Sequence, residues 1–397
     1  MRGLKFVSWG DNTGYAIAGK AYVRALIDAG VNLTWTPMLP GQRTRQPCTS
    51  SDWPCAKLAR VCNRAIDYDT VVIHSVPDHF EAWIARERKP GRRILGYTVW
   101  ELDQLPDAWP GILNQLDGVI VPCRWNAEVF RRCGVRVPIH VVPHLSQFEE
   151  IEHVGEDERE AVRQRLNPAA RASDLFTFYT VGVWSNRKSP GLVLQAYLRA
   201  FSANDPVHLV LKTSALDVSR TYRHWRNCFR RHHPPTRRTV ARMLSRHRAA
   251  PSISLIDDES LSDGQLLALH ETGDCFVSLT RTEGWGMGAF EAARLGKPVI
   301  MTGYGGQLDF LDPQQAHLVD YRMIRAEERG WSFTYRPTDL WAEPSVEHAA
   351  ALMREVFEQR EDARTRAARL AQRVAREFSR EATTGALLRA LKGGAGA

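Results

Sequence analysis

Short apolar runs alternate with amphipathic stretches along residues 1–145. The stretch at Tyr15–Ala29 has helical spacing, and Gly30 stands at its C-cap position. Strands that alternate with helices predict a parallel, doubly wound sheet. The apolar runs predict its strands at Leu4–Trp9, Val31–Thr36, Thr70–His74, Arg93–Thr98, Gly118–Pro122 and Ile139–Val142.

The same alternation starts again after Gln147–Ala172, a charged and weakly patterned stretch that we interpret as a linker running into a helix. The chain is also too long for one ordinary α/β core. We therefore expect two α/β domains in sequence, each with its ligand-binding edge at the carboxyl ends of its strands. The second set of strands is predicted at Phe176–Val183, His208–Lys212, Ile253–Ile256, Cys275–Leu279 and Pro298–Met301, with helices at Pro190–Phe201, Asp263–Glu271, Met287–Leu295 and within Glu347–Lys392.

Composition and charge narrow the class of protein. No run of eighteen apolar residues occurs, and the apolar stretch before Asp11 is too short for a signal peptide, so we expect a cytoplasmic protein. The net charge of +8 favours a polyanionic partner, which could be a diphosphate ligand, an anionic lipid surface or nucleic acid. The seven cysteines are scattered, and Cys48, Cys55 and Cys62 are spaced too widely for a zinc site, so we expect free thiols.

The strongest local motif follows the predicted strand that ends at Leu279. Gly284, Gly286 and Gly288 occupy every second position just before and within the start of a predicted helix. Glycines at this spacing let backbone N–H groups approach a ligand, and a helix N-terminus attracts anions, so the segment predicts a diphosphate cradle. Glu283 and Glu291 lie eight residues apart and could hold two separate groups of one ligand. The alternative is an ordinary strand–turn–helix with surface carboxylates.

This segment resembles the donor-binding segment of the family-4 retaining glycosyltransferases of the GT-B fold. Glu283 and Glu291 match their E-x7-E pattern, and the likeness extends over EGWGMGAFEAARLGKPVIMTGYGGQLDFL. The resemblance implies that Glu283 faces the transferred sugar and Glu291 binds the nucleotide ribose. It also implies a donor cradle formed by Gly284, Trp285, Gly286, Met287 and Gly288.

The resemblance further implies the domain plan. Residues 1–165 would form an acceptor-side Rossmann-like domain, residues 166–375 a facing nucleotide-sugar domain, and residues 376–397 a helix crossing back to the first. Transfer would retain the anomeric configuration, and it would need neither a metal ion nor a cofactor beyond the nucleoside diphosphate sugar. A UDP- or GDP-sugar is the expected donor.

Two cations are expected to clamp the donor diphosphate. The family commonly has an arginine directly after a glycine here and a lysine further on, but in this chain Val183 follows Gly182. We assign the clamp to Arg187 and Lys188 instead, because a leaving diphosphate needs its charge neutralised. A solvated Arg-Lys pair is the alternative, and Lys212, at the end of the next predicted strand, is a weaker candidate.

The first domain offers fewer local signals. Gly14, between the first strand and helix, matches the place where related enzymes bring a loop to the donor phosphates. Trp100 stands where the family often has a histidine, so no catalytic histidine is carried over there. Glu101 is the catalytic alternative, and His74 and Trp100 are the expected acceptor-side residues, although polar residues at strand ends such as Glu101 and His74 are often only turn formers.

One basic segment suggests other binding partners than a nucleotide sugar. Arg220–Arg248 contains ten arginines, four histidines and no acidic residue. It could be a solvated helix pair broken at Pro234 and Pro235, a surface for an anionic acceptor or the inner face of a membrane, or a nucleic-acid site. Nucleic acid is the least favoured of the three.

The sequence thus predicts a retaining glycosyltransferase that moves a sugar to a hydroxyl of a glycan, lipid-linked or small-molecule acceptor. The alternatives are a polyanion- or membrane-binding protein with a vestigial donor site, and a GT-B-fold epimerase. A phosphorylase is disfavoured because no lysine context for pyridoxal phosphate is apparent.

Overall fold

The computed structural model describes residues 1–39, 55–151, 154–166, 175–220, 222–224, 227–257, 261–327, 335–336 and 338–393. The chain divides into two compact units, which are described separately. Unit 1 comprises Met1–Gln147 and Arg376–Ala397, and unit 2 comprises Phe148–Ala375.

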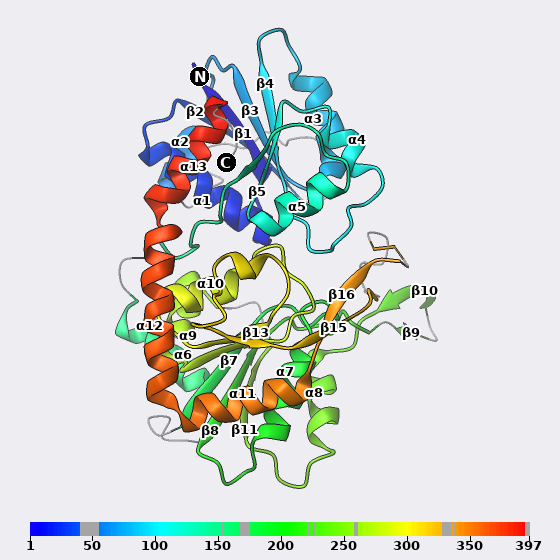
Figure 1. Cartoon of the computed structure of the whole chain (residues 1–397), viewed down its shortest axis with the longest axis vertical. Helices are drawn as coiled ribbons and strands as arrows, with labels where there is room; N and C mark the ends of the chain where they lie inside the picture. The colour runs from blue at the N-terminus through cyan, green and yellow to red at the C-terminus, as the bar shows by residue number, and fades with distance from the viewer. Residues whose placement is uncertain are drawn as a thin grey trace. The chain divides into compact units, whose positions relative to one another are not determined.

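Unit 1 is built on a six-stranded parallel sheet in the order β2-β1-β3-β4-β5-β6. Helices cover both faces, which is why β1 and β3 are buried almost throughout. In Figure 1, α1, α2 and α13 lie on one side of the sheet and α3, α4 and α5 on the other. The strands are β1 (Leu4–Trp9), β2 (Leu33–Met38), β3 (Thr70–His74), β4 (Arg93–Tyr97), β5 (Gly118–Val121) and β6 (Ile139–Val141). The helices are α1 (Gly14–Asp28), α2 (Ala56–Val61), α3 (Phe80–Glu87), α4 (Trp109–Leu113), α5 (Arg124–Arg132) and α13 (Arg380–Lys392).

The last helix of the chain is part of the core of unit 1. Leu387 and Leu391 of α13 are buried in the same apolar cluster as Tyr22 of α1. Ser379 caps the helix by accepting a hydrogen bond from the N–H of Ala382 at 3.1 Å. The apolar stripe of α13 therefore attaches this end of the chain to the first sheet.

Unit 2 repeats the architecture with a second six-stranded parallel sheet, in the order β11-β8-β7-β12-β13-β14. Its strands are β7 (Phe176–Val181), β8 (Val207–Lys212), β11 (Ser252–Ile256), β12 (Cys275–Ser278), β13 (Val299–Thr302) and β14 (His317–Val319). Its helices are α6 (Glu156–Leu166), α7 (Pro190–Ala200), α8 (Thr236–Leu244), α9 (Asp263–Thr272), α10 (Met287–Arg294), α11 (Val346–Glu358) and α12 (Arg360–Glu377). The helix α6, which the predicted boundary at 165 assigns to the first domain, packs on α9 in unit 2.

The two sheets share one topological feature. In unit 1 the chain leaves β1 for β2 on one side and places β3 on the other. In unit 2 it leaves β7 for β8 and β11 on one side and places β12 on the other. Doubly wound sheets bind ligands at the carboxyl ends of such strand pairs, where neighbouring connections diverge. The structure thus confirms the predicted fold class of two doubly wound α/β halves.

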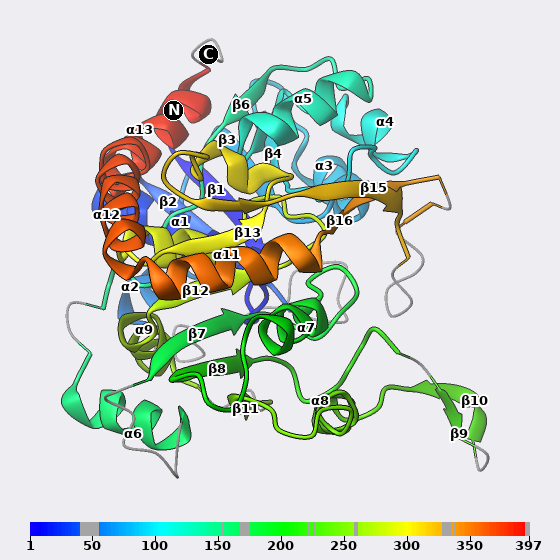
Figure 2. The same ribbon diagram turned by 60° about the horizontal axis from the view of Figure 1, so that its bottom comes forward.

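Two antiparallel hairpins are attached to unit 2, and neither was predicted. One pairs β9 (Tyr222–His224) with β10 (Asn227–His232), and the other pairs β15 (Tyr321–Arg325) with β16 (Leu340–Pro344). Figure 2 shows β9 and β10 standing away from the sheet of unit 2.

For Arg220–Arg248, the alternative of a solvated helix pair is wrong before the prolines. The described residues there form the β9–β10 hairpin, and only the part after the prolines is helical, as α8. The stretch before the prolines has no apolar stripe of helical spacing, and its aromatic residues favour strands. Pro235 precedes α8, where a missing N–H costs no helical hydrogen bond.

Candidate functional site

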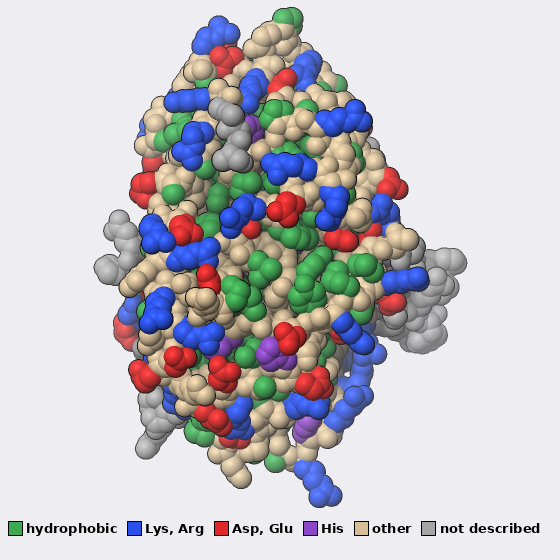
Figure 3. Space-filling model, in the orientation of Figure 1, with side chains coloured by type: hydrophobic (Ala, Val, Ile, Leu, Met, Phe, Trp, Pro, Cys, Tyr) green, Lys and Arg blue, Asp and Glu red, His purple; other side chains and the backbone are tan. Residues whose placement is uncertain are grey.

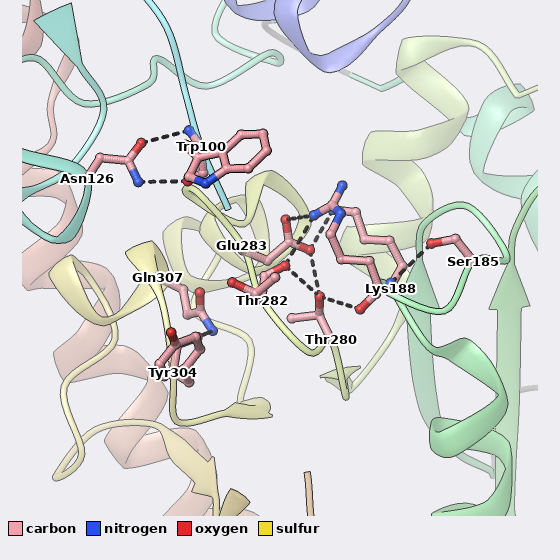
Figure 4. A network of polar contacts seen from close by, with 10 residues as sticks. Trp100, Asn126, Ser185, Lys188, Thr280, Thr282, Glu283, Tyr304 and Gln307 are labelled. Carbon is pink, nitrogen blue, oxygen red and sulfur yellow. Dashed lines mark hydrogen bonds and ion pairs between the residues drawn. The ribbon is translucent and has the colours of Figure 1, made fainter. Parts of the chain in front are cut away.

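A cluster of paired charges in unit 2 lies in the loops that follow the carboxyl ends of β7 and β12. Lys188 Nζ donates to Glu283 Oε1 at 2.6 Å, and Arg187 Nη1 donates to Glu283 Oε2 at 3.2 Å. The Glu283 side chain is only 8% exposed, against 19% for Arg187 and 30% for Lys188. Figure 4 shows Lys188 of the β7–α7 loop pointing at the Glu283 carboxylate. The structure thus brings together three of the predicted site residues.

Burial and charge act against each other on Glu283. Burial raises the pKa of its carboxyl. The charges of Lys188 and Arg187, together with the hydrogen bonds from Lys188 and Thr280, lower the pKa by more than burial raises it, so the pKa lies below its usual 4.5. Glu283 is therefore ionised at neutral pH. With two cations and one anion, the cluster keeps one net positive charge (+2 − 1 = +1).

Threonine 280 is a further member of the cluster that the sequence did not single out. Thr280 is fully buried, and its hydroxyl lies 3.0 Å from Glu283 Oε1. The same oxygen also lies within 3.2 Å of the carbonyl oxygens of Arg187 and Thr282. A hydroxyl has one proton, and the ionised carboxylate is its strongest acceptor. Thr280 thus joins the cationic loop to the carboxylate, a role that shows only after β7 and β12 pair.

Backbone contacts hold the two loops in register. The N–H of Arg281 donates to the carbonyl of Arg187 at 2.8 Å, and the Ser189 hydroxyl donates to the carbonyl of Leu279. Ser189 has φ of +40°, a left-handed conformation that is uncommon for a residue with a side chain. These contacts fix the direction in which Arg187 and Lys188 leave the loop.

A third loop encloses the backbone of Glu283. Gly306 N–H donates to the carbonyl of Glu283 at 2.8 Å, and Gly305 has φ of +106°. A Cβ at Gly305 would lie 2.8 Å from that carbonyl oxygen, closer than real contacts allow. Only glycine fits here, so the Gly-Gly pair after β13 positions Glu283. In the sequence this pair is visible only as part of the segment that resembles the family.

The glycine turn leads into α10 as the motif predicts. Gly286 has φ of +91° and precedes the first residue of α10, Met287, and no side chain caps this helix end. Gly288 lies inside the first turn, where a Cβ would come 3.0 Å from the Phe276 ring. The backbone N–H groups of this turn and the helix N-terminus form a setting suited to an anion. Gly284, like Gly286, is buried.

Two of the predicted donor-binding side chains are packed inside unit 2. Trp285 is 2% exposed and contacts the rings of Phe290 and Phe310, with centroids 5.3 and 5.0 Å away. Glu291 is fully buried on α10, and its Oε2 forms an ion pair with Arg294 Nε at 3.2 Å. Trp285 thus acts as a core residue that supports the turn, and Glu291 is held in place by the helix that carries it.

The remaining cation candidate of unit 2, Lys212, is the last residue of β8 and is half-buried. Its carbonyl accepts a hydrogen bond from the N–H of Gly182 at 3.1 Å, which ties β8 to the end of β7. Val183, where the family has an arginine, is 48% exposed.

The equivalent strand ends of unit 1 carry a different kind of site. His74, the last residue of β3, is fully buried among Tyr15, Tyr22 and Tyr97, whose ring centroids lie 5.5, 5.9 and 4.5 Å away. Within the described part of the chain, neither ring nitrogen of His74 has a hydrogen-bond partner. Burial, assisted by His144, lowers the pKa of His74 well below 6.5, so the ring is neutral.

Trp100 is a packing residue of unit 1. Its indole N–H donates to the carbonyl of Gln104 at 2.6 Å, and its ring meets Trp109 edge to face at 4.7 Å. Asn126 bonds both the N–H and the carbonyl of Trp100, at 3.1 and 2.8 Å, as Figure 4 shows. Glu101, the next residue, is half-buried, and its charge helps to raise the pKa of Tyr15 after the larger effect of burial.

Gly14 is the first residue of α1, and nothing lies within 4 Å of the position that its Cβ would take. The preceding loop is ordered by Asp11, whose Oδ1 accepts from the N–H of Thr13 at 3.1 Å. Packing therefore does not require a glycine at this position.

Other sequence expectations concern charge, metals and thiols. On the face shown in Figure 3, basic and acidic side chains are interspersed over most of the surface. Among the residues that the structure describes, no group of three or more histidine, cysteine, aspartate or glutamate side chains could hold a metal ion. No helix in the described ranges is long and apolar enough to cross a membrane. Cys55 and Cys62 are free thiols, and Cys48 lies outside the described residues.

Comparison with known proteins was made by sequence and by structure. Residues 260–387 match the model of a family described as "Family 4 Glycosyltransferase in conflict systems". The match includes Glu283 and Glu291 and confirms the family-4 resemblance over this part of the chain, which is less than half of its length. Among curated proteins, none matches the chain by sequence.

Solved structures of the GT-B fold cover nearly the whole chain. Anabaena Alr3699/HepE, in complex with UDP and glucose, aligns over 99% of this chain and 100% of its own, with a TM-score of 0.65 and 12% identity. A glycosyltransferase from Rickettsia africae aligns over 98% and 97%, with a TM-score of 0.68 and 13% identity. Sucrose-phosphate synthase from Thermosynechococcus elongatus aligns over 99% and 100%, with a TM-score of 0.66 and 16% identity. At these identities the likeness shows the fold: two Rossmann-like halves of the GT-B type.

Proposed function

We propose that this protein is a glycosyltransferase that takes a sugar from a nucleoside diphosphate sugar, retains its anomeric configuration and passes it to a hydroxyl acceptor. The observation that carries the proposal is the cluster of Arg187 and Lys188 on Glu283, beside an uncapped, glycine-rich helix start. The family match over residues 260–387 supports it, and so does UDP in the complex of the similarly folded HepE.

The charges suit a diphosphate leaving group. The cluster of Arg187, Lys188 and Glu283 carries one net positive charge, and the N-terminus of α10 adds positive potential from its backbone. When the bond between the sugar C1 and the phosphate oxygen breaks, negative charge grows on that oxygen. Fixed cations and N–H groups stabilise such charge without rearranging, and this is the largest source of catalysis available here.

The carboxylates take different roles in this proposal. Glu283 is ionised, held in place by its two cations and Thr280, and suited to orient the hydroxyls of the transferred sugar. Glu291 on α10 binds the ribose hydroxyls. The proton of the acceptor hydroxyl passes to the phosphate oxygen that leaves, on the same face of the sugar as the new bond. No side-chain nucleophile is needed, so the protein contributes position and charge.

We propose that transfer needs no divalent metal, because Arg187, Lys188 and the α10 N-terminus already provide positive charge for the diphosphate. EDTA should leave the initial rate within about twofold of the rate in Mg²⁺. Removing an essential Lewis acid would lower the rate far more, because such a metal stabilises the transition state by several kcal/mol. Activity that disappears with EDTA and returns with Mg²⁺ would contradict this part of the proposal.

The first experiment is a thermal-shift panel with UDP, GDP, ADP and their glucose, N-acetylglucosamine and mannose conjugates. A ligand that binds only the folded protein raises the melting temperature, with about 2.7 kcal/mol of stabilisation at 100 times its dissociation constant. We expect UDP or GDP conjugates to give the largest shift and Lys188→Ala to reduce it. The stabilising donor is then tested for release of its nucleoside diphosphate. If no nucleotide raises the melting temperature, the protein has no donor site and the proposal fails.

A further inference from the structure

A basic pocket lies in unit 2, against the loops that carry the cation cluster. Its volume is about 630 Å³, and it is lined by Asn186, Arg220, Arg281, Ile324, Arg325 and Trp341, with Glu327 and Ser219 at its wall. Asn186 directly precedes the clamp residue Arg187, and Arg281 N–H donates to the Arg187 carbonyl at 2.8 Å. The proposed donor cluster and this pocket therefore share two loops.

The β15–β16 hairpin forms one wall of the pocket and is fixed to the loop after β12. Ile324 and Trp341 are cross-strand partners, and the N–H of Ala342 donates to the carbonyl of Arg281 at 3.0 Å. Arg281 braces the corner, because its guanidinium pairs with Glu343, donates to the carbonyl of Asn186 and lies over the Trp341 ring at 5.3 Å. The wall is thus a built structure with a fixed arginine.

The side chains of two other arginines of the pocket are available to a ligand. Arg220 and Arg325 are exposed, and neither forms an ion pair within the described part of the chain. Counting Arg220, Arg281 and Arg325 against Glu327 and the Arg281 partner Glu343 leaves one net positive charge (+3 − 2 = +1). Guanidinium groups suit phosphate oxygens because their N–H donors match them in pairs.

Trp341 is a packed part of the pocket wall. It is only 2% exposed, and the Arg281 guanidinium lies over its ring at 5.3 Å. Its ring therefore gives the wall a rigid shape, and the hydrogen-bond donors of the pocket come from the arginines.

We propose that this pocket binds a phosphate group of a small or lipid-linked ligand, held by Arg220 and Arg325 with Trp341 at its wall. That the ligand is the sugar acceptor rests on the proposed function, whereas the phosphate binding does not. The pocket would then place a phosphate-bearing acceptor next to the loops that hold the donor diphosphate.

The test measures binding of glycerol 3-phosphate by calorimetry at low salt. Removing a charged hydrogen-bond partner should weaken binding about tenfold per arginine, in Arg220→Ser and in Arg325→Ser. Arg322→Ser is the matched control, because it removes one exposed arginine from the same strand without lining the pocket.

Lys188→Ala separates this pocket from the donor cluster. Its affinity for glycerol 3-phosphate should stay at the wild-type value, whereas its response to UDP or GDP should fall. If Lys188→Ala loses the phosphate and the Arg220 and Arg325 variants do not, the phosphate binds in the donor cluster and the pocket proposal is overturned. If the protein bound phosphate through Arg220 and Arg325 but bound no nucleotide, the proposed function would be wrong and the pocket proposal would stand.

A second arm distinguishes the source of the phosphate. Vesicles of phosphatidylglycerol are compared with vesicles of phosphatidylcholine for each variant. Binding to phosphatidylglycerol alone, lost in Arg220→Ser and Arg325→Ser, would identify a lipid headgroup as the ligand. Binding of glycerol 3-phosphate with the same arginine dependence would identify a soluble phosphate ester. The absence of both would overturn the proposal.

Discussion

The two sheets of this protein differ in strand order, but each has a point where neighbouring connections diverge, and the strand ends at these two points carry opposite chemistry. In unit 2, the ends of β7 and β12 bring Arg187, Lys188 and Glu283 into a paired and ionised cluster. In unit 1, the end of β3 places His74 among tyrosine rings, and neither of its nitrogens has a hydrogen-bond partner in the part of the chain that the structure describes.

The difference teaches where the chemistry can lie. Buried charges that are paired can stay ionised, and they can stabilise a charge that forms next to them. A buried histidine without partners loses its charge instead, and it contributes shape rather than electrostatics. Equivalent positions in a repeated fold thus indicate where a ligand could bind, whereas the local charges indicate which half can act on a diphosphate.

The largest expected effect is on turnover at Glu283. Glu283→Gln removes the charge that orients Arg187, Lys188 and the sugar, so kcat should fall by about 10²–10³, the cost of losing one preorganised transition-state contact. Glu101→Gln in unit 1 is the paired control and should change kcat by less than about tenfold. Steady-state kinetics with the donor from the thermal-shift panel compares the two. If the two variants lost equal activity, the contrast between the units would not hold.

The next largest effect is on donor affinity. Lys188→Ala and Arg187→Ala each remove a charged contact to the diphosphate and should weaken nucleotide binding by about 1.5–3 kcal/mol. Lys188 contacts Glu283 at the shorter distance, so we expect it to have the larger effect. Calorimetry with the nucleoside diphosphate measures both, and Lys212→Ala should lose less. If Lys212→Ala lost more nucleotide affinity than Lys188→Ala and Arg187→Ala, Lys212 at the end of β8 would be the cation that holds the diphosphate.

Buried histidines should make both units lose stability in acid. Burial lowers the pKa of His144 in unit 1 and of His270 in unit 2 to about 3, that of His317 in unit 2 to about 4, and that of His74 in unit 1 well below 6.5. A histidine that is neutral when folded gains a proton on unfolding below its ordinary pKa of 6.5. Its contribution to stability is therefore complete above pH 6.5 and is lost as the pH falls, by about 2 kcal/mol per histidine at pH 5.

Urea unfolding at pH 7.5 and pH 5 tests this with His74→Phe, which should lose less stability on acidification than the wild type. His247→Gln, which replaces an exposed histidine, is the control and should follow the wild type. An unchanged pH dependence in His74→Phe would mean that His74 is not held neutral by burial.

The smallest expected effect is at Gly14. Because no atom lies within 4 Å of the added Cβ, Gly14→Ala should leave the fold intact and stabilise it by about 0.4–1 kcal/mol through the unfolded chain. If the start of α1 approaches the donor phosphates, the same methyl group should raise the donor KM. A stable variant with unchanged KM would remove Gly14 from the donor site and leave all of the donor chemistry to unit 2.

The sequence by itself determined the repeated strand–helix alternation, because fully buried parallel strands require apolar runs and their crossovers require amphipathic helices. It also determined the glycine turn before α10, since the positive φ of Gly286 depends on the residue type. The predicted bounds of β1 and β3 match the structure residue by residue.

Only the tertiary structure decided how the site is assembled. Glu283 lies 95 residues after Lys188, and the two meet because β7 and β12 are neighbours in the sheet, which no local pattern specifies. The same holds for Thr280, which became part of the cluster through that pairing, and for Trp100, which tertiary contacts made a packed residue. The basic segment before Pro234 became a hairpin because short strands pair through backbone bonds that residue spacing does not reveal. Local periodicity sets the elements, and the order of strands in the sheet sets which side chains meet.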